Sequence, residues 1–91
     1  MNIESVKKIT IRACESELII IYQLFESEYT DGTRHFGVCI QCETTGEAAI
    51  VHDLTSNRAC AKQFFHSIVQ GKVTPIHLKD LAQDYVTLIS L

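Results

Sequence analysis

Three groups of residues in this chain have types and spacings suited to chemistry. The first is the pair Cys39-x-x-Cys42, because thiolates at this spacing are typical of zinc ligands and of redox dithiols. Zinc sites of this kind normally use a second pair, whereas Cys14 and Cys60 are isolated. In a strand, the two side chains would point to opposite faces of the sheet and could not share a metal. We therefore expect ordinary strand cysteines, with no metal and no other cofactor.

The second group is His77, Asp80 and Asp84, spaced i, i+3 and i+7 near the end of the chain. In a helix this spacing places the three side chains along one stripe. There they could bind a small ligand or a metal, or act as a general acid and base. A structural role is the simpler explanation, since the first turn of a helix favours capping groups and acidic side chains. We retain the three as candidate binding residues and expect no catalytic role.

The third group is the segment 52–58, with the sequence HDLTSNR, where a strand is expected to give way to a helix. Asp53 and Arg58 are its candidate binding residues, because a helix N-terminus with a nearby guanidinium can hold an anion. The glycine-rich spacing of a phosphate-binding loop is absent from the sequence. Turn formation and helix capping explain this composition more simply than a ligand does.

The first half of the chain reads as four strands, because apolar residues alternate between turn signals. The expected strands are 6–13, 18–28, 35–43 and 47–53. Asp31-Gly32 between two apolar runs is a hairpin signal. Every connection is short, which favours an antiparallel meander.

The second half changes to helical periodicity. Residues 57–70 form one expected helix, capped by Ser56 or Asn57 and ended by Gly71 in left-handed geometry. The last helix starts at Pro75 after a Thr74 cap. Its apolar stripe is Leu78, Leu81, Ala82, Tyr85, Leu88 and Ile89. The predicted fold is α+β: a four-stranded antiparallel meander followed by two C-terminal helices packed on the sheet, in the order ββββαα.

Length and composition limit the classes of function. The 91 residues form a single expected domain, residues 1–91, with a net charge of −3 and scattered lysines and arginines. We expect no nucleic-acid binding, because no basic stripe exists to contact phosphates. The longest apolar run, 18–22, is too short to span a membrane, and the first residues lack the apolar stretch of a signal peptide. The sequence therefore predicts a cytoplasmic protein without membrane contact, with reduced cysteines.

Two internal motifs and the end of the chain carry a family resemblance. The motifs are Phe36-Gly37-Val38 and Asp53-Leu54-Thr55, and the end is the run 73–78, VTPIHL, followed by Asp80, Asp84 and Tyr85. On these residues the last two-thirds of the chain resembles a family of small uncharacterised bacterial proteins, a domain of unknown function. The resemblance implies a bacterial cytoplasmic domain and assigns no activity.

The second expected strand is apolar on both faces, which is unusual for an antiparallel sheet with one solvated face. With both helices on one face, the other would expose Ile19, Ile21 and Phe25, joined by Cys39, Ala49 and Val51. A second register would exchange the two sets, and helices on opposite faces would bury both.

This exposed face underlies the predicted function. We expect a non-catalytic protein-interaction module that forms a homodimer or binds a protein partner. The candidate interface residues are Ile19, Ile21, Phe25, Cys39 and Val51. The alternative is a small-ligand or metal-binding protein, conceivably an enzyme, that uses His77, Asp80 and Asp84.

Overall fold

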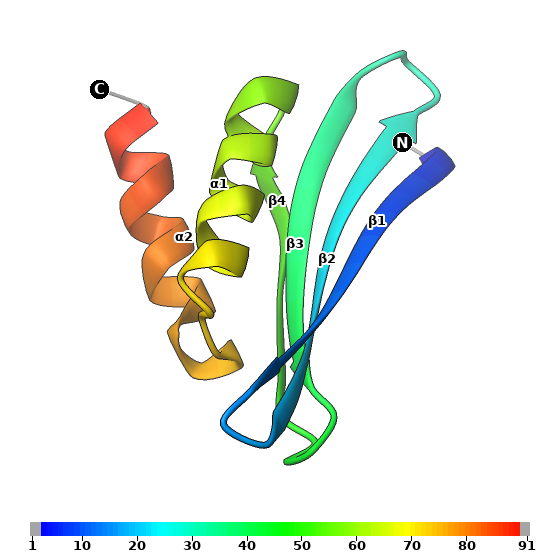
Figure 1. Ribbon diagram of the computed structural model, residues 1–91. Helices are drawn as coiled ribbons and strands as arrows, with labels where there is room; N and C mark the ends of the chain where they lie inside the picture. The colour runs from blue at the N-terminus through cyan, green and yellow to red at the C-terminus, as the bar shows by residue number, and fades with distance from the viewer. Residues whose placement is uncertain (1–2, 90–91) are drawn as a thin grey trace.

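Four antiparallel strands form one sheet, followed by two helices (Figure 1). The computed structural model describes residues 3–89. The strands are β1 (Ile3–Glu15), β2 (Leu18–Tyr29), β3 (Arg34–Cys42) and β4 (Ala48–Thr55). They lie in the order β1-β2-β3-β4, so each strand pairs with its neighbour in the sequence. The predicted ββββαα meander is confirmed.

Two tight turns fix the first three strands. The β2–β3 turn places Gly32 at a φ of +88°, and Asp31 accepts hydrogen bonds from the backbone N–H and the hydroxyl of Thr33. The predicted hairpin at Asp31-Gly32 is therefore confirmed. The β1–β2 turn puts Ser16 and Glu17 at φ values of +50° and +68°. This mirror-image conformation matches the twist of the strands that it joins.

The helices are α1 (Arg58–Gln70) and α2 (Pro75–Ile89). Asn57 caps α1 by accepting a 3.0 Å hydrogen bond from the Cys60 N–H, as predicted. The predicted left-handed Gly71 is wrong, because Gly71 has a φ of −77°. Lys72 takes the positive φ, +52°, one residue later.

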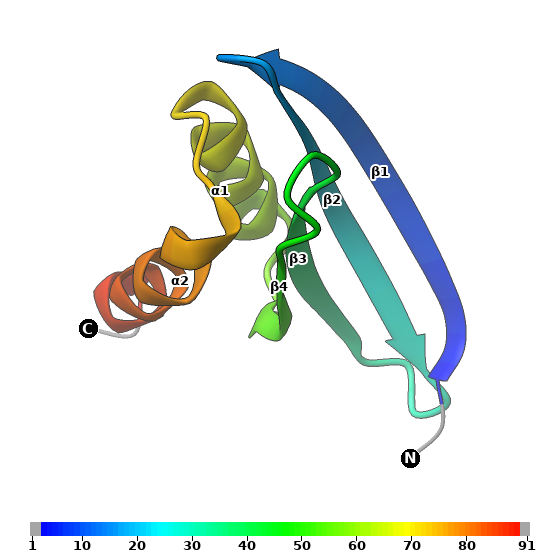
Figure 2. The same cartoon turned by 90° about the horizontal axis from the view of Figure 1, so that it is seen from below.

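Both helices pack on the same face of the sheet, as Figure 2 shows from a second direction. Of the four strands, β2 makes the largest share of the contacts with α1, which also contacts β3 and β4, whereas α2 contacts β4 above all. The alternative with helices on opposite faces is therefore wrong. The pair is shifted toward β4, and β1 lies outside the area that the helices cover (Figures 1 and 2).

The core lies between the helices and one face of β2 and β3. Tyr22, Val38, Ile40 and Leu78 are fully buried in it. The other core residues are Ile20, Leu24, Phe36, Leu54, Ala61, Phe64, Phe65, Ile68 and Ala82.

Two tyrosine hydroxyls tie the helical layer together. Tyr22 donates to the carbonyl of Val73 at 3.0 Å, and Tyr85 donates to the carbonyl of Cys60 at 3.0 Å. Leu81, predicted in the apolar stripe of α2, is instead 39% exposed. The side chains of Leu88 and Ile89, also placed in that stripe, lie outside the described residues.

Candidate interaction surface

The face of the sheet opposite the helices, here the open face, carries an apolar centre. Ile19, Ile21 and Phe25 on β2 lie there, partly exposed. Cys39 on β3 pairs with Ile50 on β4, which is 40% exposed. The alternation along β2 explains the arrangement, because Ile20, Tyr22 and Leu24 point to the helices and leave the intervening residues to the open face.

Phe25 and Gly37 make a close contact on this face. The two residues pair across β2 and β3. A Cβ on Gly37 would lie 2.4 Å from Phe25 Cε2 and 2.5 Å from the Val51 carbonyl oxygen. The absence of a side chain at Gly37 therefore lets the Phe25 ring lie over the strand. The ring also approaches His52, with ring centroids 6.4 Å apart.

Polar pairs surround the apolar centre. Arg12 contacts Glu43 at 3.0 Å, and His35 Nδ1 lies 2.9 Å from Asp53 Oδ1. Lys8 on β1 pairs with Phe25, and its positive charge partly offsets the rise in the pKa of the Cys39 thiol. Apart from Gln23, which lies between Ile21 and Phe25 and contacts Thr10, the face has an apolar centre and a polar rim, the usual anatomy of a protein interface.

Val51, expected on the open face together with Ala49, lies on the helix side. Val51 pairs with Val38, Ala49 pairs with Ile40, and both pack against the core. The register explains the difference. The N–H of Cys42 bonds the carbonyl of Glu47, so four residues separate β3 from the pairing partner. Adding or removing one residue in this loop would shift the register of β4 by one and turn each of its side chains to the other face of the sheet.

The two cysteines of the C-x-x-C pair lie on opposite faces, as the strand prediction required. Cys42 is buried on the helix side, and a hydrogen bond with Thr45 lowers the pKa of its thiol. Cys39 lies on the open face, where burial raises the pKa of its thiol and Lys8 opposes that shift. Within the described part of the chain, no three side chains of the ligand types His, Cys, Asp and Glu gather to hold a metal.

His77, Asp80 and Asp84 are all exposed on α2. His77 and Asp80 line a shallow hollow beside the α1–α2 loop, and Asp84 lines a separate one between the helices. Val73 and Leu81 line both. None of the three side chains bonds to another residue in the described range. The structure thus leaves them as solvated groups without a shared pocket.

Asp53 and Arg58, the other candidate binding residues, are not brought together. Asp53 contacts His35 on the open face. Arg58 binds Glu26 through Nε at 3.2 Å and Nη2 at 2.9 Å on the helix side. With its guanidinium directed to a carboxylate, Arg58 does not form the expected anion site with Asp53.

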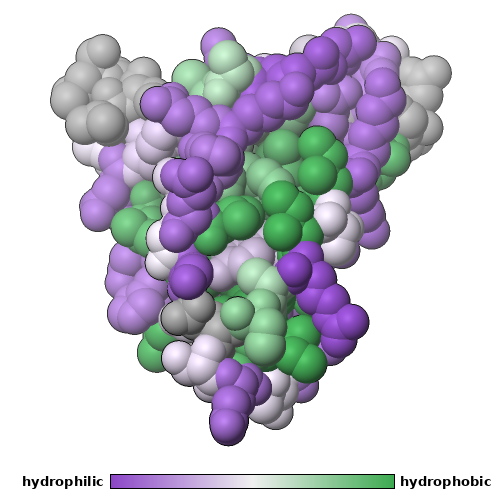
Figure 3. All heavy atoms as spheres, viewed as in Figure 1, coloured by the Kyte–Doolittle hydropathy of each residue, from purple (hydrophilic) through white to green (hydrophobic). Residues whose placement is uncertain are grey.

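A groove between α1 and β1 was not anticipated from the sequence. Its cavity volume is about 390 Å³. Figure 3 shows green apolar side chains gathered between α1 and the β1–β2 edge, with purple side chains on both sides. The sequence does place Lys7 and Ile9 on one face of β1, but it could not show that α1 would stop short of that strand.

Comparison with known proteins matches the chain to a protein family. A family model described as a family of unknown function, DUF6514, matches residues 1–88. The chain belongs to this family. No curated protein and no solved structure matches the DUF6514 chain.

Membership confirms the resemblance to an uncharacterised family and extends it over almost the whole chain. The family is one of unknown function, so membership assigns no activity to this chain. Among the described residues, no helix combines the length and apolar character that crossing a bilayer requires.

Proposed function

We propose that this chain is a small, non-catalytic interaction module that forms a homodimer through the open face. The observation that carries the proposal is the placement of both helices on one face, with Ile19, Ile21, Phe25, Cys39 and Ile50 left on the other. Burying apolar side chains that are exposed on a sheet face lowers the free energy, so an assembly that covers this face is favoured.

The size of the face suits a dimer. Four strands about 4.8 Å apart and about nine residues long give roughly 19 × 30 Å, or about 570 Å². Two such faces would bury about 1,100 Å² in total, just above the roughly 1,000 Å² expected of a specific interface. Sheets pack face to face about 10 Å apart.

The charges at the two edges also favour a second copy as the occupant. Lys8 lies on β1 at one edge, whereas Asp53 lies in the bulged part of β4 at the other and its side chain is 68% exposed. A twofold axis parallel to the strands exchanges the edges. It would bring Lys8 of one copy near Asp53 of the partner subunit, and the reverse.

The proposal places this dimer in a reducing bacterial cytoplasm. All four cysteines are free thiols, and Cys14 is exposed. In an oxidising compartment an exposed thiol would be prone to disulfide formation, whereas a reducing one keeps it free.

Molar mass in solution tests the proposal directly. Light scattering after size exclusion should give about twice 10.2 kDa for the native chain. Ile21→Asp should give a monomer, because a carboxylate in an apolar interface lacks a partner. Ile76→Asp is the matched control: Ile76 is 73% exposed on α2, so this variant should keep the native mass.

A charge exchange tests the orientation. Lys8→Glu should raise the dimer dissociation constant about fivefold, equivalent to about 1 kcal/mol. Adding Asp53→Lys should recover most of the loss. A monomeric native chain, or an Ile21→Asp variant that keeps the native mass, would refute the sheet-face dimer.

A further inference from the structure

We infer that the groove between α1 and β1 binds an acidic amphipathic helix of a protein partner. This surface is separate from the open face, and the inference does not depend on the dimer. Its basis is the combination of an apolar floor, a cationic rim and a strip of sheet that the protein's own helices leave bare.

The floor of the groove is apolar and includes surface that a helix would normally cover. Ile9, Leu24 and Phe36 form it, one residue from each of three adjacent strands. Leu24 and Phe36 are buried in the core, whereas Ile9 is 49% exposed and the adjacent Ile11 is 38% exposed. Both isoleucines lie on the helix side of the sheet, since Ile9 pairs with Leu24 and Ile11 pairs with Tyr22.

The position of the helices explains this exposure. One helix is about 10 Å wide and covers about two strands, so two helices can cover a four-stranded sheet. Here α2 lies mainly on β4, and α1 makes no substantial contact with β1. The strip over β1 is therefore left uncovered, and the groove lies there beside α1.

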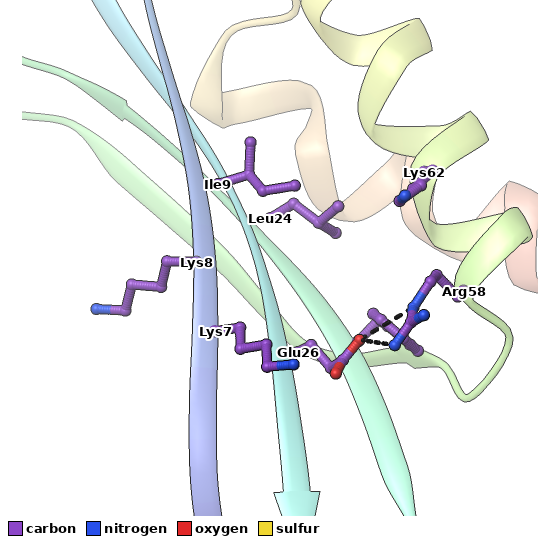
Figure 4. A pocket seen from close by; sticks show the side chains of 8 residues that line it. Lys7, Lys8, Ile9, Leu24, Glu26, Arg58 and Lys62 are labelled. Carbon is purple, nitrogen blue, oxygen red and sulfur yellow. Dashed lines mark hydrogen bonds and ion pairs between the residues drawn. The ribbon is translucent and has the colours of Figure 1, made fainter.

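The charged residues at the rim of the groove favour an acidic partner helix. Lys7, Arg58 and Lys62 border the groove, and Glu26 is the only carboxylate among the described residues that line it. Figure 4 shows Arg58 bound to Glu26, Lys7 extending toward the same carboxylate, and Lys8 pointing away. The positive groups outnumber the single negative one, so the groove complements a helix with acidic residues beside its apolar stripe.

An extended strand is a poorer fit than a helix. The apolar floor lies over β2 and β3 and beside α1, not outside the free edge of β1. A strand added to that edge would sit about 4.8 Å beyond β1 and would reach the floor only with its longest side chains. A helix on the strip would place its residues at i, i+3 and i+7 directly on Ile9 and Leu24.

A synthetic peptide of about 16 residues can serve as the probe, with leucines at helical spacing and glutamates on both sides of them. Fluorescence anisotropy of the labelled peptide would measure binding to the full chain. A second peptide carries lysine in place of every glutamate, and a third has a central proline that breaks the helix. We expect the glutamate peptide to bind at least about tenfold more tightly than either, and more weakly as salt is raised.

Variants of the protein locate the binding site. Ile9→Glu and Lys62→Glu should each weaken the glutamate peptide about tenfold or more, since one removes the floor and the other the charge. Lys79→Glu is the matched control, because Lys79 is an exposed lysine on α2, outside the groove. Circular dichroism should show the same helix content in all three.

The outcomes separate the possible occupants. Equal binding of the glutamate and lysine peptides, or an unchanged affinity in Lys62→Glu, would overturn the inference. Tight binding of the proline peptide would indicate an extended occupant and would overturn it as well. A homodimer that Ile9→Glu dissociates in the absence of peptide would show a second copy in the groove, with the same consequence.

The result is independent of the sheet-face dimer. Ile9 and Ile21 lie on opposite faces of the sheet. Ile21→Asp should therefore abolish the dimer and keep the affinity for the glutamate peptide. Ile9→Glu should lose the peptide and keep the dimer mass.

Discussion

The two faces of the sheet are built from the same strands but differ in how far their side chains are exposed. On the helix side, Ile20 and Tyr22 are 1% and 0% exposed. On the open face, Ile19 and Ile21 occupy the alternate positions of the same strand and remain partly exposed. Because the hydrophobicity of β2 is similar on its two sides, composition does not distinguish them. The position of the helices decides which side becomes the core.

A further contrast runs across the helix side itself. Over β2, β3 and β4 this side is closed by α1 and α2, whereas over β1 it carries Ile9 at 49% exposure. Apolar surface is thus left in two places for two reasons. Within the described residues no helix packs on the open face, and the β1 strip is not covered because the helices are shifted toward β4.

The largest expected effect comes from truncating neighbouring isoleucines on the two faces. Ile20→Ala should lower the free energy of unfolding by about 3 kcal/mol, because it leaves a cavity in a closed core. In the monomer, Ile21→Ala should cost about 1 kcal/mol, since less apolar surface is lost and solvent fills the space. Urea denaturation of both variants, at a protein concentration low enough to keep the chain monomeric, measures the difference. Equal costs would show that Ile21 is as buried as Ile20 within one chain, and the contrast between the faces would not hold.

Gly37→Ala tests the contact that supports the open face. A Cβ there would lie within 2.7 Å of three atoms, two of which are backbone oxygens of β4 that cannot turn away. We expect a loss of about 2 kcal/mol in unfolding free energy. Phe25→Ala combined with Gly37→Ala should recover only part of it, because the backbone oxygens remain.

Gly32→Ala provides the control for this prediction. Gly32 has open space around it and a φ of +88°, so the substitution carries only the cost of the left-handed backbone, about 1 kcal/mol. A Gly37→Ala variant more stable than Gly32→Ala would show that β3 and β4 separate easily. The Phe25 ring would then need no glycine beneath it.

Much of the fold was predictable because local signals agree with one another. Alternation placed Phe36, Val38 and Ile40 on one face, and Asp31-Gly32 set the hairpin before them. Helical spacing identified the buried face of α1, including Phe64 and Ile68. Each of these signals lies within about a dozen residues, where sequence periodicity is informative.

The surfaces were only partly predictable, because they depend on contacts distant in sequence. The prediction that Val51 lies on the open face is wrong, since the length of the β3–β4 loop decides the register and the sequence of β4 fits either side. The groove could not be predicted because it depends on the position of α1 across the sheet. Asp53 and Arg58 are only five positions apart, yet each finds a partner elsewhere, in His35 and Glu26.

The tyrosine hydroxyls that fasten the helical layer should have moderate effects. Tyr22→Phe removes the hydrogen bond to the Val73 carbonyl beside a fully buried ring, and we expect a loss of about 1 kcal/mol in unfolding free energy. Tyr85→Phe should cost about half as much, because Tyr85 is only partly buried and water can replace its hydroxyl. Thermal denaturation of the two variants checks the order. A larger loss for Tyr85→Phe would show that the hydrogen bond between the two helices stabilises the fold more than the one between β2 and the α1–α2 loop.

The smallest expected effect is a pH dependence that comes from Tyr85 on the helix side. Burial, with a contribution from Cys60, raises the pKa of Tyr85 above its ordinary value. Folding therefore favours the protonated phenol. Its contribution to stability is complete below the unfolded pKa of about 10 and is lost as pH rises through the higher folded value. Tyr85→Phe should remove this part of the alkaline decline in melting temperature, whereas Ile21→Ala should leave it unchanged. An identical decline in Tyr85→Phe and the native chain would assign alkaline unfolding to other groups, and the phenol would then contribute only through its packing against Phe64.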